Sequence, residues 1–384
     1  MKTRTLGLGL VGLTAFLLAG CGASARPLQP SQSLETSSTV EATSVPTTSP
    51  PAAAIPSGAA LPRAVRTESV TFISTQVGWV LGTVNCAPTG TLCAPVLLRT
   101  DDGGRSWASA PSPHDLTVNQ VRFADADDGW MWDANSGPDG LWSTHDGGLH
   151  WKQPPLPISP QEGYLSDVEA AGGVVYATVN ASPIMIMSSP IGQDDWSVSP
   201  TTIPLGAGPV PSEQIVLQGH SGWIVEGDRT VVGGARLVNG SWQPWTPPCM
   251  QAEGPVWLTA SDPLHLTAYC QGGIWGGAAS VSLDLSFDGG STFQSRDLPF
   301  PVTAFGPIAS PSIGVVFFGD DVNHELMDSF DAGQSWTVVY RGSSTSDWQY
   351  IGFTTPDQGV AIDNGLLMMT FNGGSTWDPI ALTT

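Results

Sequence analysis

An eight-residue pattern recurs five times, and this repetition restricts the possible folds more than any other feature of the chain. Each copy has a hydroxyl residue first, Asp or Asn third, Gly fifth and an aromatic residue last. The copies are Thr100–Trp107, Thr144–Trp151, Ser286–Phe293, Ser329–Trp336 and Thr370–Trp377. Asp accepts hydrogen bonds from turn amides, and Gly adopts backbone angles that other residues avoid. The pattern therefore predicts five tight hairpin turns.

A second element precedes each turn: an alternating apolar strand, a short turn, and then in most copies Gly followed by an apolar residue. Clear copies include Gly78-Trp79, Gly129-Trp130 and Gly222-Trp223, and weaker copies bring the number of units to seven. The steps from Phe72 to Phe353 average about 47 residues, the size of a four-stranded blade. With many Gly, Pro and Trp residues and no long helical stretch, the chain is predicted to be all-β. It is predicted to form one β-propeller of seven four-stranded blades over residues 66–384, a ring without a free sheet edge.

The eight-residue pattern resembles the Asp box, or BNR-like repeat, of sialidases and other propellers. That resemblance implies structural roles on the rim rather than catalysis. The positions concerned are Asp102, Gly104, Trp107, Asp146, Gly148, Trp151, Asp288, Gly290, Phe293, Asp331, Gly333, Trp336, Asn372, Gly374 and Trp377. The Phe/Tyr-Arg-Ile-Pro motif of sialidases is absent, so sialidase activity is not predicted.

Together with the Gly-Trp strand, the repeat is also similar to the propeller family of photosystem II assembly and stability factors and to related bacterial lipoproteins. The family implies a scaffold that binds other proteins. Its basic binding patch is not visible in a chain so poor in Arg and Lys. The scaffold role is therefore an expectation, and a photosystem partner is not.

The N-terminus predicts export and lipid attachment. Lys2 and Arg4 precede an apolar run that is too short to cross a bilayer, and Leu18-Ala19-Gly20-Cys21 follows. This order resembles a bacterial lipobox, which implies that residues 1–20 are a signal peptide and that Cys21 is lipidated. The alternative is an ordinary signal peptide cleaved near Ala25. Residues 21–65 are rich in Ser, Thr and Pro and are predicted to be a disordered tether.

Charge restricts the partners. Removal of Lys2 and Arg4 would leave 11 basic against 34 acidic side chains, a net charge of −23. Nucleic acid and anionic membrane surfaces require a cationic face, so they are not expected partners. The predicted protein is an extracytoplasmic monomer that contacts the cell membrane through its lipid. The scarcity of lysine suits an acidic medium, although surface drift explains it equally well.

Four further cysteines, Cys86, Cys93, Cys249 and Cys270, form an even set in an exported chain, which favours two disulfides. Local pairing, Cys86 with Cys93 and Cys249 with Cys270, is the simplest of three connectivities. Neither spacing matches a zinc site.

Two acidic segments are weak candidates for chemistry. Asp321, Asn323 and Glu325 place oxygen atoms at alternate positions, like half of a calcium loop, but a plain hairpin turn fits the same residues. Asp125, Asp127 and Asp128 lie where a turn is expected. The histidines His114, His145, His150, His220 and His265 have no metal spacing and are predicted to be solvated or to cap turns. The sequence predicts no catalytic residues, and calcium is the one cofactor it suggests.

Three functions remain open. The first is a non-catalytic, membrane-tethered scaffold that binds an envelope protein or a glycan. The second is a glycoside hydrolase with its carboxylates on non-repeat loops. The third is a calcium-dependent structural protein of the envelope.

Overall fold

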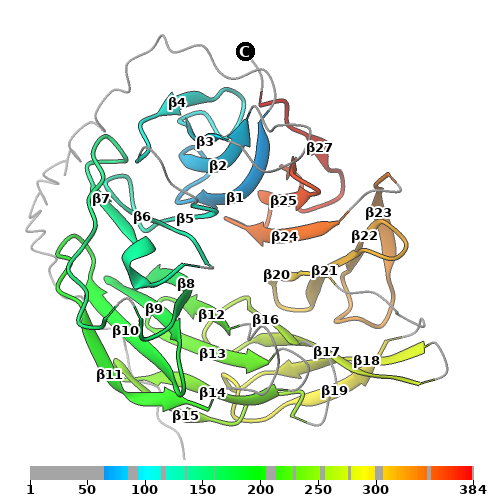
Figure 1. The fold of residues 1–384 in the computed structure, drawn as a ribbon. Coiled ribbons are helices and arrows are strands. Elements are labelled where there is room, and N and C mark those ends of the chain that lie inside the picture. The colour runs from blue at the N-terminus through cyan, green and yellow to red at the C-terminus, as the bar shows by residue number, and fades with distance from the viewer. Residues whose placement is uncertain are drawn as a thin grey trace, which may run out of the picture. The chain divides into compact units, whose positions relative to one another are not determined.

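The computed structural model describes residues 65–84, 94–113, 118–134, 136–159, 161–204, 213–227, 231–250, 256–275, 278–298, 306–343 and 347–382. The chain divides into two units, Met1–Ser49 and Pro50–Thr384, and every described residue belongs to the second. In that unit seven antiparallel sheets follow one another around a centre (Figure 1). The prediction of an all-β, seven-bladed propeller is therefore confirmed. Within the described ranges, no helix has the length and hydropathy that a membrane crossing requires.

The first three blades contain eleven strands and one short 3₁₀ helix. Blade 1 consists of β1 (Arg66–Phe72), β2 (Gly78–Val84), β3 (Ala94–Thr100) and β4 (Ala108–Ala110). Blade 2 consists of β5 (Gln120–Phe123), β6 (Asp128–Trp132) and β7 (Trp142–His145), with η1 (Pro138–Gly140) between β6 and β7. Blade 3 consists of β8 (Tyr164–Ala171), β9 (Val174–Asn180), β10 (Ile184–Pro190) and β11 (Ser197–Ile203).

The other four blades each contain four strands. Blade 4 consists of β12 (Glu213–Gln218), β13 (Ser221–Gly227), β14 (Val231–Val238) and β15 (Ser241–Trp245). Blade 5 consists of β16 (Val256–Ala260), β17 (Leu266–Trp275), β18 (Ala278–Ser286) and β19 (Gln294–Asp297). Blade 6 consists of β20 (Ile308–Ser312), β21 (Val315–Asp320), β22 (Glu325–Ser329) and β23 (Thr337–Arg341). Blade 7 consists of β24 (Trp348–Phe353), β25 (Gly359–Asp363), β26 (Leu366–Thr370) and β27 (Asp378–Pro379).

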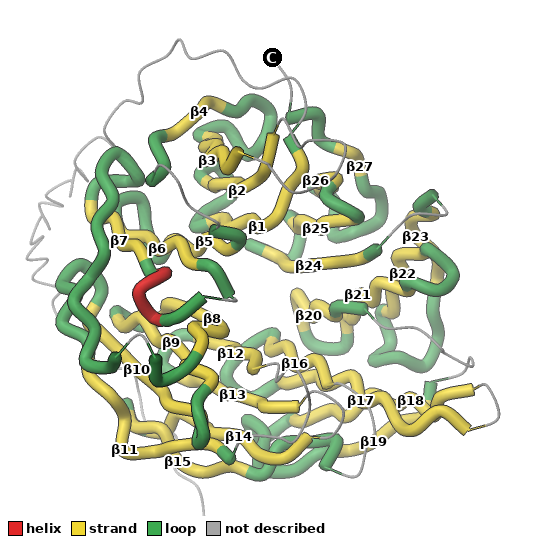
Figure 2. The backbone as a smooth tube through the Cα atoms, viewed as in Figure 1, coloured by secondary structure: helices red, strands yellow, loops and turns green. Residues whose placement is uncertain are grey.

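Within every blade the strands pair in chain order, and the first strand lies nearest the centre (Figure 2). Blade 2 departs from the prediction of four strands. Its sheet has three, and a single antiparallel bridge between Ser143 and Lys152 stands in the fourth position.

The recurring Gly-apolar element has a steric cause. Phe72 at the end of β1 is paired with Gly78 at the start of β2, and a Cβ atom added to Gly78 would lie 2.6 Å from the Phe72 ring. Gly129 is paired with Phe123 in the same way, and Gly359 with Phe353. In each pair the phenylalanine ring thus lies over the glycine, where any larger residue would clash with it. The pattern marks the hairpin between the first two strands of a blade.

The five repeat turns share one hydrogen-bond scheme. In the first, Thr100 Oγ1 donates to Asp102 Oδ1 (2.9 Å) and accepts from Gly104 N (2.8 Å). Asp102 also accepts from Ser106 N (2.8 Å) and from Ser106 Oγ (2.6 Å). The same set forms around Asp288 and Asp331. Around Asp146 the His150 ring takes the place of the second hydroxyl, and around Asn372 the direction of the last bond is reversed, because Asn372 Nδ2 donates to Thr376 Oγ1. These bonds lower the pKa of Asp331 to about 2, so its carboxylate stays ionised.

The repeat turns also connect neighbouring blades. Gly333 has a φ of +81°, and a Cβ atom there would lie 2.6 Å from Leu283 of the preceding blade. Gly374 lies against Phe317 in the same way, and Gly104 lies against Met369. The glycine at the fifth position of the repeat therefore lets one blade approach the side chains of the blade before it.

The ring closes between blade 7 and blade 1 without a shared sheet, because all strands of blade 7 come from one continuous segment. The Thr67 amide donates to the Gly365 carbonyl (2.8 Å), and Gln358 Nε2 donates to the Thr75 carbonyl (3.3 Å). Side chains of both blades form one buried cluster, which includes Val70 and Met369. Packing and a few hydrogen bonds therefore hold the two ends of the ring together.

Substitutions of two glycines distinguish the cost of backbone strain from the cost of losing the contact between blades. Gly314 and Gly333 both have positive φ angles, but a Cβ atom at Gly314 would meet nothing closer than 3.9 Å. We expect Gly314→Ala to cost about 1 kcal/mol in free energy of unfolding, from the left-handed backbone alone. Gly333→Ala should cost about 3 kcal/mol, because Leu283 must also move. Urea denaturation measures both. Equal losses would show that the Gly333 contact does not join blades 5 and 6.

Candidate functional site: the central channel

The inner strands of blades 4 to 7 surround a cavity of about 480 Å³ at the centre of the ring. Strands β12, β16, β20 and β24 supply most of its wall, and Glu169 of β8 supplies a carboxylate. The polar part of the wall is largely hydroxyl and amide groups, from Gln214, Gln218, Thr259, Ser310 and Thr354. Some of these groups also bond within the protein, since Gln218 Nε2 donates to the Ala260 carbonyl (2.7 Å) and Ser310 Oγ to the Val315 carbonyl (2.8 Å). The wall offers a ligand their remaining neutral donors and acceptors.

A second hollow, of about 210 Å³, lies among the inner strands of blades 1, 2 and 7. Its wall contains Glu68, Asn119 and Arg122. Tyr350 of β24 lines both this hollow and the larger cavity. The two spaces are therefore neighbours across one tyrosine side chain.

An ion pair stands where these spaces meet. Arg122 of β5 and Glu169 of β8 approach to 2.7 Å between Nη2 and Oε1, and Tyr350 forms a side-chain hydrogen bond with Arg122. Three different blades thus supply the members of this cluster. Each one is separated from the others in sequence by about one repeat or more.

Burial governs the charges of this cluster. Burial raises the pKa of Glu169 to about 7, with Asp167 adding to the rise and Arg122 opposing it. Burial alone would lower the pKa of Arg122, but the charges of Glu169, Tyr350 and Asp167 raise it above its usual range. The guanidinium is therefore always charged, whereas the Glu169 carboxyl changes protonation near neutral pH.

The channel wall also satisfies the exposed edges of the inner strands. Asp167 Oδ2 accepts a hydrogen bond from Ile215 N of the next blade (2.9 Å), and Gln214 Oε1 accepts one from Leu258 N (2.8 Å). Ser69 does the same for Val121 N (3.2 Å). The expectation of a ring without free edges therefore needs correction. The inner edges exist, and side chains of the preceding blade cover them.

The predicted calcium candidates bond to other residues of the protein. Asp321 Oδ1 accepts a hydrogen bond from Trp348 N (2.6 Å), Asn323 donates to Asp320 Oδ2 (2.7 Å), and Glu325 pairs with Arg341. Asp320 also accepts from two amides of the turn between β21 and β22, which is the hairpin that the sequence offered as an alternative. One carboxylate oxygen each of Asp321 and Glu325 therefore has a protein partner, and Asn323 engages Asp320 through its amide nitrogen.

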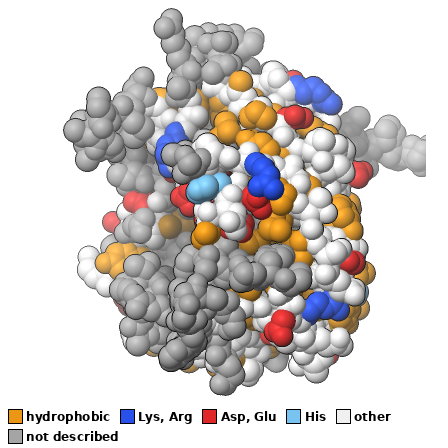
Figure 3. All heavy atoms as spheres, turned by 90° about the vertical axis from the view of Figure 1, so that its right-hand side faces the viewer, with side chains coloured by type: hydrophobic (Ala, Val, Ile, Leu, Met, Phe, Trp, Pro, Cys, Tyr) orange, Lys and Arg blue, Asp and Glu red, His pale blue; other side chains and the backbone are white. Residues whose placement is uncertain are grey.

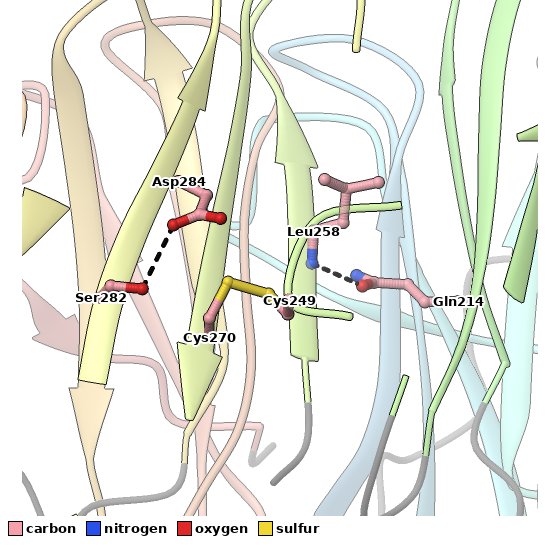
Figure 4. The surroundings of a disulfide bond; sticks show 6 residues. All are labelled: Gln214, Cys249, Leu258, Cys270, Ser282 and Asp284. Atoms are coloured by element: carbon pink, nitrogen blue, oxygen red, sulfur yellow. Dashed lines mark hydrogen bonds between the residues drawn. A yellow bond between two sulfur atoms is a disulfide. The ribbon is translucent and has the colours of Figure 1, made fainter. Parts of the chain in front are cut away.

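Cys249 and Cys270 form the predicted disulfide, which ties the segment after β15 to β17 (Figure 4). The other predicted pair, Cys86 with Cys93, and the predicted lipid site at Cys21 lie outside the described residues. Among the described residues, one group of three side chains has metal-ligand atoms within 4.8 Å of one another: Cys249, Cys270 and Asp284. Because its two sulfur atoms are bonded to each other, this group is not a thiolate site.

A charged cluster joins blades 2 and 3, and the sequence did not predict it. His145 Nδ1 lies 2.5 Å from Asp128 Oδ1, and Nε2 lies 2.9 Å from Asp194 Oδ2. Asp194 also accepts from Ser143 Oγ (2.9 Å) and pairs with Lys152 Nζ (3.0 Å). His145 is 25% exposed, so the prediction of a solvated or capping residue was wrong for it. Nothing in its local sequence points to Asp194, 49 residues away.

The fold defines the class of protein, a seven-bladed β-propeller with a polar central channel. No protein-family profile matches the chain, and no curated protein matches it.

Among solved structures, the chain is similar to YCF48 bound to D1 peptide (TM-score 0.58, 19% identity, covering 82% of this chain and 95% of that one). It is also similar to YCF48 from Cyanidioschyzon merolae (TM-score 0.58, 15% identity, 82% and 99%). A third is virginiamycin B lyase from Staphylococcus aureus (TM-score 0.55, 15% identity, 79% and 94%). At these identities the likeness shows the fold alone.

The His145 cluster should make stability depend on pH. Burial lowers the pKa of His145, but its hydrogen bonds with Asp194 and Asp128 outweigh burial and raise the pKa above 6.5. The stabilisation is thus complete below pH 6.5 and is lost as pH rises through the raised pKa. We expect His145→Asn to cost about 2 kcal/mol at pH 6 and clearly less at pH 9. Urea denaturation across this pH range measures the difference.

His150 provides the control for this experiment. Its ring is 88% exposed and contacts only the carboxylate of its own turn, Asp146, among the partners described. His150→Asn should therefore change stability little at either pH. A loss for His145→Asn that does not change between pH 6 and pH 9 would contradict an imidazolium held between two carboxylates.

Proposed function

We propose that the protein is a non-catalytic, membrane-tethered extracytoplasmic scaffold, and that its central channel binds a segment of an envelope protein. The observation that carries the proposal is the 480 Å³ cavity with its wall of hydroxyl and amide groups. An extended peptide offers one donor and one acceptor per residue, which such a wall satisfies. The Arg122–Glu169 pair adds charges for the ends or side chains of a peptide. A glycan also offers hydroxyl groups to this wall, so it is the second ligand class to test.

Two further observations support a peptide. The protein YCF48, which shares the propeller fold, has been solved bound to D1 peptide. In addition, the net charge of −21 favours a neutral or basic ligand. The membrane tether in this proposal rests on the lipobox at Cys21 and on the Ser, Thr and Pro residues that follow it.

A glycoside hydrolase is the second candidate, and one observation favours it. Glu169 lines the cavity, and its pKa of about 7 is what a general acid requires at neutral pH. In this alternative Glu169 protonates the leaving group of a bound glycan. Release of sugar from a polysaccharide panel, abolished by Glu169→Gln, would support the hydrolase over the scaffold.

The lipid anchor can be tested directly. Cells that express the full chain and are fed a labelled fatty acid should incorporate the label into the protein, because the Cys21 thiol is the acceptor. Cys21→Ala should lose all of the label, whereas Cys86→Ala should keep it. Label that persists in Cys21→Ala, or that is absent from the wild type, would refute the anchor.

The channel is tested by filling it. Thr259 lies in the cavity wall on β16, and Thr337 is exposed on the outer strand β23. The full chain in detergent is applied to an array of peptides that cover the envelope proteins of its source, and to a glycan array. We expect peptide binding that Thr259→Tyr weakens at least tenfold, about 1.4 kcal/mol, and that Thr337→Tyr leaves unchanged. Equal binding by both variants would mean that the channel is not the site.

A further inference from the structure

Three phenylalanines occupy the same position in three consecutive blades, and all of them are exposed. Phe287, Phe330 and Phe371 each follow the hydroxyl residue that opens a repeat turn, in blades 5, 6 and 7. Their exposed fractions are 50%, 61% and 48%. Isolated exposed apolar residues are ordinary on a protein surface, but a repeated placement of the largest ones is not.

The turn itself does not require phenylalanine. The same position holds Asp101 in blade 1 and His145 in blade 2, and both of those turns keep the same hydrogen bonds around Asp102 and Asp146. The three phenyl rings are therefore independent of the scheme that forms the turn.

Two more exposed apolar side chains lie beside these rings. The turns between the first two strands of blades 5 and 6 carry Leu264 and Ile313, which are 55% and 57% exposed. Gly289 N donates to the Leu264 carbonyl, and Ala332 N donates to the Gly314 carbonyl, both at 2.8 Å. These bonds fasten each repeat turn to its neighbour. Leu264, Phe287, Ile313, Phe330 and Phe371 form what we call the apolar arc.

The arc presents its side chains on a fixed frame. Arg236 of blade 4 donates to Ser291 Oγ in the turn that carries Phe287 (3.0 Å). Arg296 of blade 5 donates to the Asp331 carbonyl in the turn that carries Phe330 (3.4 Å). Because the turns that carry Phe287 and Phe330 are held by the preceding blade and by a turn of their own blade, little of their conformational entropy is lost when a partner binds. The five side chains together expose a few hundred Å², distributed over three consecutive blades.

Charge around the arc is predominantly negative. The turns that carry the arc residues contain Asp262, Asp288 and Asp331, and the Asp357 carbonyl accepts from Gly373 N in the turn that carries Phe371 (2.9 Å). The nearby guanidinium groups are those of Arg236 and Arg296, which are occupied with the turns. Figure 3 shows a side of the propeller where hydrophobic side chains lie among scattered acidic and basic ones. A partner that complements the arc therefore carries apolar side chains between basic ones.

We propose that the apolar arc is a second binding surface, separate from the channel, for an extended protein segment that combines apolar residues with Lys or Arg. A lipid surface fits less well, because the carboxylates would face the bilayer and the protein is strongly acidic. A glycan fits less well because the arc contains only hydrocarbon side chains, without the hydrogen-bonding edge of Trp or Tyr.

The test uses the full chain in lipid nanodiscs and three fluorescent twelve-residue peptides. The first peptide combines Leu and Arg, the second replaces Arg with Glu, and the third replaces Leu with Ser. We expect fluorescence anisotropy to detect binding of the first peptide only. The triple variant Phe287→Ser, Phe330→Ser, Phe371→Ser should raise its Kd at least tenfold.

Two controls separate this surface from a general loss of apolar area and from the channel. The variant Tyr164→Ser, Val198→Ser, Met250→Ser removes three exposed apolar side chains, two from blade 3 and one from the segment after β15, and it should leave the Kd unchanged. Thr259→Tyr, which fills the channel, should also leave it unchanged. A result in which Thr259→Tyr alone weakens binding would assign the peptide to the channel and overturn the arc.

Other outcomes also decide the proposal. No binding of the Leu-Arg peptide, or equal binding of the Leu-Glu peptide, overturns it. So does binding of the oligosaccharide cellohexaose that the triple phenylalanine variant abolishes, because the occupant would then be a glycan. If the triple phenylalanine variant keeps the wild-type melting temperature and the wild-type affinity, the arc is not the binding surface.

Discussion

The ring depends on one type of turn, which occurs five times. In it, a hydroxyl group and a carboxylate or amide side chain form hydrogen bonds with the backbone amides of the turn, and a glycine occupies the fifth position. Thr100, Asp102 and Gly104 represent the five copies. The side chains replace water as hydrogen-bond partners, so the turn keeps its shape while its glycine lies against the preceding blade. A local motif thereby creates a long-range contact. Five of the seven blades contact the preceding blade in this way.

The residues with chemical character lie elsewhere, on the innermost strands. Arg122, Glu169 and Tyr350 come from blades 2, 3 and 7, and none of them lies in the eight-residue repeat. A propeller brings such residues together because the first strand of every blade faces the same channel. The repeats thus fix the frame, and variable positions on the inner strands determine what the channel binds. The apolar arc is the exception, since its phenylalanines lie inside the repeat turns.

The sequence predicts what is local and misses what is distant. The hairpin turns and the count of seven blades follow from residue spacing within each repeat, because their hydrogen bonds join residues at most four apart. Pairing of Cys249 with Cys270 was the simplest connectivity of the cysteines, and the structure contains it. The three-stranded blade 2 was not predicted. Its repeat turn is followed by Lys152 at the place where a fourth strand begins in other blades, and the sequence does not show that only one bridge forms there.

Contacts between blades left no signal in the sequence. His145 belongs to a repeat turn, yet its second carboxylate comes from Asp194 in the next blade. The Arg122–Glu169 pair joins two inner strands, and alternation alone does not say which polar residues face each other across blades. In blade 5, Phe293 replaces the tryptophan of the repeat, and Trp245 of blade 4 donates to the Gly290 carbonyl (2.7 Å). The change to Phe293 is visible in the sequence, but the role of Trp245 is visible only in three dimensions.

Hydrogen exchange of the intact chain tests most directly the claim that the repeat turns hold the blades together. The amides of Gly104, Gly148, Gly290, Gly333 and Gly374 donate to hydroxyl groups inside the turns. If the turns are joints between blades, these amides should exchange as slowly as those of the second strands, because both open only when the ring unfolds. Exchange at the rate of exposed hairpin turns, while the strands stay protected, would contradict the account.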